Sequence, residues 1–136
     1  MPDEKSDYVG IQVRRGDYLK CTGLFNIPPA DWYNEMYWKY FNGKKAIITS
    51  NDEEWCRNNL RIENAEYISS SDPVEDIRKM SICKDFIISA STYGWWCAYL
   101  AEQPDSKIIC PWPWFNPHSN IKDDRKYPER WIKEDV

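Results

Sequence analysis

Apolar and β-branched residues gather in five short runs along the chain, and the segments between them carry a helical spacing of apolar residues. The runs lie at residues 8–13, 46–49, 66–68, 86–89 and 107–110. The first run is apolar at nearly every position apart from Gln12, which fits a strand buried on both faces of a sheet. The pattern therefore predicts five strands that alternate with helices.

The first two predicted helices have recognisable starts and stops. Residues 28–31 open a helix that Asn42 and Gly43 end, and its aromatic residues recur on one face. Ser50 and Glu53 form a capping-box pattern, in which a hydroxyl residue precedes a glutamate by three positions. We expect that second helix to run to about Leu60.

The other two predicted helices follow the third and fourth strands. Asp72 and Pro73 make a strong helix start, because Asp is a favoured N-cap and Pro suits the first helical position. Val74, Ile77 and Met80 are expected on the inner face of this helix. The fourth helix is expected to extend from residue 91 to about residue 101.

This alternation predicts an α/β fold, with a Rossmann-like parallel sheet flanked by helices. The 136 residues match the usual size of one domain, so we expect a single domain over residues 1–136. From about residue 111 to 136 the chain is rich in Trp and Pro and then charged, and we expect an irregular tail there. Ligands of such sheets bind beyond the carboxyl ends of the strands, which directs attention to the residues after 13, 49, 89 and 110.

The first two of these strand ends carry polar side chains. Arg14 and Arg15 follow the first strand, and guanidinium groups match phosphate oxygens in bidentate geometry. The alternative is a surface ion pair with Asp17. After the second strand, residues 50–52 either cap the next helix or use Asp52 to bind a ribose or a base edge.

The other two strand ends carry hydroxyl and aromatic residues. Ser89, Ser91 and Thr92 lead into a predicted helix whose N-terminus would attract an anion, although Ser91 could serve only as its cap. Residues 111–115, Pro-Trp-Pro-Trp-Phe, form either a stacking platform or a hydrophobic lid. Together the four strand ends describe a cleft that suits a nucleoside diphosphate with a sugar facing outward.

Composition narrows the classes of partner and location. The net charge of −4 makes nucleic acid a poor partner. No apolar run approaches the ~20 residues of a membrane span, and residues 1–7 are polar, so we expect a cytoplasmic protein, with peripheral contact to a membrane left open. His118 is the single histidine and the five cysteines form no C-x-x-C pair, so we expect no metal site.

Four segments, in matching order and spacing, resemble the motifs of the α1,2-fucosyltransferases, glycosyltransferase family 11. Residues 9–18 resemble the family's H-x-R-R-x-D-Y, and residues 48–52 resemble its F-S-D-D. Residues 76–96 are similar to its D-l-x-L-M-S-x-C-x-H-x-I-I-S-N-S-T-F-S-W-W, whose S-T-[FY]-x-W-W block is the most specific part. Residues 111–115 resemble its P-x-x-W-F, so the resemblance covers most of the chain.

The resemblance implies the C-terminal, donor-binding half of a GT-B enzyme that transfers fucose from GDP-fucose to a galactoside hydroxyl without a metal cofactor. Arg14 would contact the diphosphate with support from Arg15. Asp17 and Tyr18 would shape the sugar end, and Asp17 is the nearest candidate for a general base. The other residues expected to bind substrate are Asn51, Asp52 near the nucleoside, Ser89, Ser91, Thr92 and Trp95.

Three residues depart from the family pattern. Gln12 stands at the motif's His, Ala90 at its Asn, and Asp85 where a His is frequent. The resemblance also lacks the N-terminal half that would bind the glycan acceptor. A second chain or domain could supply that half, and the alternative function is a non-catalytic module that binds a GDP-sugar.

Overall fold

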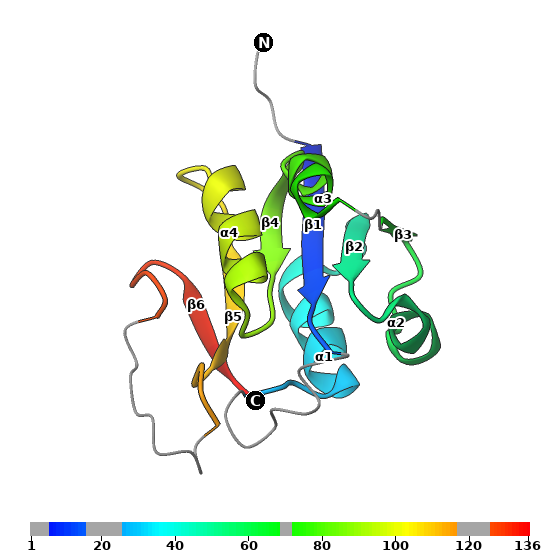
Figure 1. Ribbon diagram of the computed structural model, residues 1–136, viewed down its shortest axis with the longest axis horizontal. Coiled ribbons are helices and arrows are strands. Elements are labelled where there is room, and N and C mark those ends of the chain that lie inside the picture. Colours follow the sequence, from blue (N-terminus) through cyan, green and yellow to red (C-terminus); the bar gives the residue numbers. More distant parts are fainter. Residues whose placement is uncertain (1–5, 16–25, 69–71, 117–125) are drawn as a thin grey trace.

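The computed structural model describes residues 6–15, 26–68, 72–116 and 126–136. In this part of the chain, six strands form one sheet in the order β3-β2-β1-β4-β5-β6, and every neighbouring pair is parallel (Figure 1). The predicted Rossmann-like α/β fold is confirmed. The strands are β1 (Ser6–Val13), β2 (Ala46–Ser50), β3 (Ala65–Tyr67), β4 (Cys83–Ile87), β5 (Ile108–Trp112) and β6 (Ile132–Asp135).

Helices cover both faces of the sheet. The described helices are α1 (Ala30–Phe41), α2 (Glu53–Asn59), α3 (Pro73–Met80) and α4 (Thr92–Ala101). In β1, Val9, Ile11 and Val13 pack with the apolar residues of α1 and with Cys56 of α2 in one core. On the other face, Phe86 and Ile88 pack with residues of α3 and α4 in a second core, because side chains alternate across a strand.

Asp72 is confirmed as a helix cap, Ser91 takes the capping role that was the alternative to anion binding, and the predicted cap of the second helix is wrong. Asp72 caps α3 by accepting from the Val74 N–H, as predicted, and Ser91 caps α4. The cap of α2 is Asp52 and not Ser50, since the Asp52 carboxylate accepts from the Trp55 N–H at 3.3 Å. The capping-box prediction therefore misplaced the cap by two residues.

The inner face of α3 also differs from the prediction in one position. Met80 is fully buried and Ile77 packs against the second core. Val74, however, is 71% exposed. Val74 lies in the first turn of α3, so the helix buries only the later part of its apolar face.

The C-terminal tail contains a strand where an irregular segment was expected. Strand β6 pairs with β5 from the register Ile109–Ile132 to Trp112–Asp135. Trp131 is buried in the second core just before the strand, and Glu134 accepts hydrogen bonds from Lys39 and Tyr40 of α1. These tertiary contacts stabilise a strand in a segment whose charged sequence does not indicate one.

The strand order reverses between β1 and β4. From β1 the chain crosses to β2 and β3 on one side, whereas from β4 it crosses to β5 and β6 on the other. The chain therefore continues from β1 and from β4 toward opposite edges of the sheet. Rossmann-like sheets bind their ligands at such a reversal.

Candidate functional site

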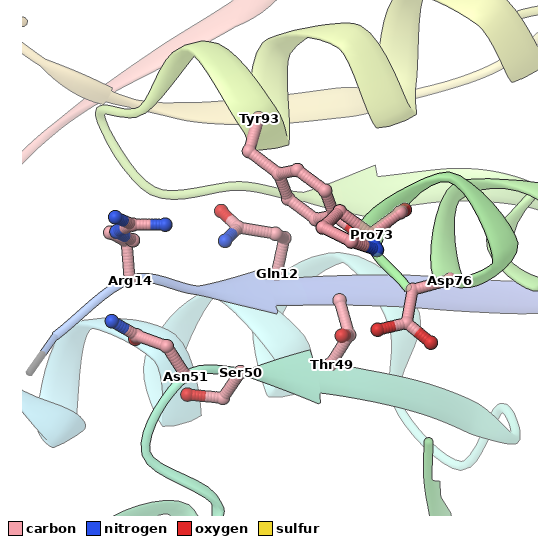
Figure 2. A pocket seen from close by; sticks show the side chains of 8 residues that line it. All are labelled: Gln12, Arg14, Thr49, Ser50, Asn51, Pro73, Asp76 and Tyr93. Carbon is pink, nitrogen blue, oxygen red and sulfur yellow. The ribbon is translucent and has the colours of Figure 1, made fainter. Parts of the chain in front are cut away.

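A pocket of about 180 Å³ lies beside this reversal, at the carboxyl ends of β1 and β2 and under the N-termini of α3 and α4 (Figure 2). Its walls come from four elements. The lining residues are Gln12, Arg14, Thr49, Ser50, Asn51, Pro73, Asp76 and Tyr93. The volume is smaller than the roughly 300–1,000 Å³ of pockets that enclose a drug-sized ligand, so this pocket can enclose only part of a nucleotide sugar.

Arg14 lies at the open end of the pocket, directly after β1. Its backbone N–H donates to the hydroxyl of Ser89 at 2.9 Å, which ties the end of β1 to the segment after β4. Its guanidinium and the side-chain amide of Asn51 lie at the same end of the pocket in Figure 2. The structure therefore brings together one cationic and one amide group beyond the carboxyl ends of the strands, where ligands of such sheets bind.

Arg15 supports this end of the pocket from outside it. Its backbone N–H donates to Asn51 Oδ1 at 2.8 Å, and the Asn51 amide donates back to the Arg15 carbonyl at 3.1 Å. The guanidinium carbon lies 3.8 Å from the centre of the Trp55 ring, a cation–π contact. Arg15 thus joins the ends of β1 and β2 and does not line the pocket.

Ser89 is buried behind the pocket and connects three segments. Its hydroxyl donates to the Gln12 carbonyl at 3.0 Å, accepts from the Arg14 N–H, and lies 2.6 Å from the hydroxyl of Tyr33. Burial raises the pKa of Tyr33, so its hydroxyl stays protonated and can donate to Ser89. A serine hydroxyl has one donor and two acceptor positions, and all three are in use. The structure therefore makes Ser89 a positioning residue for Arg14.

Ser91 and Gln12 pack together at the start of α4. The Ser91 hydroxyl accepts from the Gly94 N–H at 3.0 Å and donates to Gln12 Oε1 at 3.4 Å. A Cβ atom on Gly94 would lie 2.4 Å from Gln12 Oε1, so glycine allows this close approach. Both Gln12 and Ser91 are almost fully buried, and the next residue, Thr92, is exposed on the first turn of the helix.

Two other expected substrate-binding residues lie away from the pocket. Asp52 caps α2 and does not line the pocket. Trp95 stacks on Tyr99 with 4.7 Å between ring centres, packs against Trp131, and donates its indole N–H to the carbonyl of Lys126 at 2.9 Å. Trp95 therefore holds the C-terminal segment against α4. Asp17 and Tyr18 lie outside the described residues.

The sequence reasoning missed several polar residues of the pocket, among them Asp76 and Tyr93. The Tyr93 hydroxyl donates to the Pro73 carbonyl at 2.9 Å and so links α4 to α3. Burial raises the pKa of Tyr93, with further contributions from Cys97 and Asp76. A signal for Asp76 existed, since it lies four residues before Met80 and therefore on the buried face of α3.

The described residues include neither a metal-binding cluster nor a membrane-spanning helix. No group of three or more His, Cys, Asp or Glu side chains within residues 6–15, 26–68, 72–116 and 126–136 is placed to hold a metal ion. Over the same ranges, no helix combines the length and apolar character that crossing a membrane requires.

Comparisons with known proteins all indicate the same family. The chain is 32% identical to galactoside alpha-(1,2)-fucosyltransferase 1 of Sus scrofa over 114 residues, which cover 73% of this chain and 30% of the pig protein. It is 30% identical to the O-antigen biosynthesis glycosyltransferase WbnK of Escherichia coli, over 88% of this chain and 43% of that protein. It is 28% identical to an alpha-1,2-colitosyltransferase of Escherichia coli, over 92% of this chain and 47% of that protein.

These alignments cover between about a third and a half of each relative's length. No solved structure gives a significant match. The model of glycosyl transferase family 11 matches residues 1–135. Because that match extends over nearly all of the sequence, the chain belongs to glycosyl transferase family 11.

Proposed function

We propose that this chain forms the donor-binding part of a galactoside 2-α-L-fucosyltransferase, which transfers fucose from GDP-fucose to a galactoside hydroxyl. The observation that carries the proposal is the pocket at the carboxyl ends of β1 and β2, with Arg14 at its open end, in a member of family 11. Two of the relatives carry fucosyl or colitosyl transfer with 1,2 linkage in their names. The chain then corresponds to the C-terminal half of a GT-B enzyme.

The proposed chemistry is a displacement at the anomeric carbon of fucose. The acceptor hydroxyl oxygen attacks that carbon, the bond from the carbon to the phosphate oxygen breaks, and GDP leaves with the electron pair. The hydroxyl proton passes to a base, for which Asp17 is the candidate by its place in the motif. Negative charge grows on the leaving diphosphate, and a guanidinium held at that point stabilises it.

Arg14 is suited to this role because its backbone is held on both sides. Ser89 binds the Arg14 N–H, and the reciprocal Arg15–Asn51 hydrogen bonds hold the next residue. A catalytic group gains most when its position is set before the substrate arrives. We expect this cation, and not a metal ion, to neutralise the donor diphosphate.

A non-catalytic GDP-sugar-binding module is the second candidate function. One observation favours it: Gln12 replaces the motif's His. In that case the acceptor-binding surface belongs to a second chain or domain. The partners in either case are a nucleotide sugar and, for the enzyme, a glycan acceptor. We place the protein in the cytoplasm, with peripheral contact to a membrane as the alternative.

One pair of assays separates the two functions. Transfer of radiolabelled fucose from GDP-fucose to lactose or to other β-galactosides supports the enzyme. Calorimetric binding of GDP and GDP-fucose without turnover supports the binding module. If neither nucleotide binds the chain, both functions are rejected.

The Arg14→Ala variant tests whether GDP binds at this pocket. Replacing Arg14 with alanine is expected to weaken GDP binding by about 1.5–3 kcal/mol, about 10–150-fold, which is the range for hydrogen bonds to charged groups. Arg61→Ala is the matched control, because Arg61 is exposed and does not line this pocket. Equal GDP affinity in the two variants would remove Arg14 from the site.

A further inference from the structure

The pocket is polar at both ends, with opposite charge. Arg14 and Asn51 lie at its open end, and Asp76 lies at the other, with Gln12 and Thr49 between them (Figure 2). Asp76 is only 6% exposed, yet its side chain lines the cavity. The first turns of α3 and α4, joined by the Tyr93–Pro73 hydrogen bond, enclose this inner end.

The two ends suit different parts of one ligand. A carboxylate accepts hydrogen bonds and donates none, and it repels phosphate. Phosphate oxygens therefore belong at the Arg14 end, and a neutral group with N–H donors belongs against Asp76. The nucleoside end of a nucleotide sugar meets that requirement. Asp52, the acid that the sequence suggested for this role, is engaged in capping α2 and does not line the pocket.

We propose that Asp76 recognises the base of the donor nucleotide and makes the site selective for guanine. The proposal rests on the proposed function, because it assigns the inner end of the same donor pocket. Guanine carries two adjacent donors, N1–H and the 2-amino group, which the two oxygens of one carboxylate can accept together. Adenine offers a single donor group beside an acceptor, and hypoxanthine keeps N1–H but has no amino group. A base that lacks one of these donors makes fewer hydrogen bonds to the buried carboxylate and is bound less tightly.

The wild-type chain tests this with three probes. Calorimetry with GDP, inosine diphosphate and ADP holds the phosphates constant and changes only the base. We expect GDP to bind about tenfold or more tightly than inosine diphosphate, and about 100-fold or more tightly than ADP. Comparable affinities for the three would overturn the assignment of Asp76 while leaving the diphosphate site intact. Absence of binding by all three would reject the proposed function and this inference together.

A substitution links the selectivity to Asp76. Asp76→Asn keeps the shape of the side chain but replaces one acceptor oxygen with a donor. We expect GDP affinity to fall by about tenfold or more and ADP affinity to change by less than about threefold. Glu75→Gln is the matched control, because it neutralises the adjacent acid of α3, which pairs with Arg78 outside the pocket.

Titrations of the Asp76→Asn variant can also overturn the inference. GDP and ADP affinities that fall by the same factor, or a GDP-to-ADP ratio that stays at the wild-type value, would show that Asp76 does not read the base. A thermal melt of each variant establishes that it is folded during the titration. If Asp76→Asn does not fold, comparable affinities of the wild-type chain for the three diphosphates would still overturn the inference.

Discussion

Replacing Ser89 with alanine removes the hydroxyl that holds the end of β1 in place. The substitution leaves the Arg14 N–H and the hydroxyl of Tyr33 without this partner. Tyr33 is fully buried, so water cannot replace the lost hydrogen bond. Each orphaned buried group costs about 1–3 kcal/mol, so we expect the free energy of unfolding to fall by about 2–4 kcal/mol.

A second substitution distinguishes this mechanism from a loss of packing. Tyr33→Phe removes the group that Ser89→Ala would orphan, so the double variant should be more stable than the sum of the single effects predicts by about 1 kcal/mol or more. Urea unfolding followed by tryptophan fluorescence gives all four free energies. Ser81→Ala is the control for the same chemical change, because the Ser81 hydroxyl bonds the Arg78 carbonyl at the surface.

The functional readout of Ser89→Ala is GDP affinity. Loss of the Arg14 anchor should weaken binding, whereas the Ser81→Ala control should leave it unchanged. Strictly additive effects of the Ser89 and Tyr33 substitutions, or a Ser89→Ala chain as stable as wild type, would refute the reasoning.

The other predictions concern packing, capping and ionisation. Gly10→Ala places a Cβ 2.6 Å from Cε1 of Phe86, and we expect urea unfolding to show a loss of about 1–3 kcal/mol that Phe86→Leu partly restores; an unchanged stability would contradict the clash. Asp72→Ala removes the cap of α3 and should cost about 1 kcal/mol, measured in the same way, and a cost near zero would contradict the capping role. Burial raises the pKa of the Cys97 thiol from 9.0 to about 12, so the thiol stays protonated in the folded chain at pH values where the unfolded chain loses that proton. Its contribution to stability is therefore complete below pH 9.0 and falls by at most about 1.4 kcal/mol per pH unit as the pH rises from 9.0 toward 12, and a Cys97→Ala chain with the same slope would contradict this.

Several features of the fold and site were predictable because they depend on local chemistry. The buried run of β1 and the Asp72–Pro73 start of α3 lie where their patterns place them, since capping and alternation act over a few residues. The position of the pocket and of the polar groups of Arg14 and Asn51 was predictable, because parallel strands end together at one edge of the sheet and ligands bind there.

Other features depended on contacts between segments far apart in the chain. Strand β6 has few apolar residues of its own, and its ladder with β5 and the burial of Trp131 order it. Neither contact can be read from the residues of the strand. Several of the expected substrate ligands do not line the pocket, for reasons that differ. Ser89 faces the interior between β1 and α1, Asp52 is used as a helix cap, and Trp95 faces the C-terminal segment.

By itself, the sequence determined the alternation of strands and helices and the family, and it located the candidate site at the ends of the strands. The tertiary structure decided which side chains line the pocket. A helix turns by about 100° per residue, so whether an acid such as Asp76 points into the pocket depends on how α3 packs on the sheet. That rotation is set by the packing of Met80 and Ile77 against the second core. The sequence alone therefore does not show that Asp76 lines the pocket, and the packing of α3 on the sheet decides it.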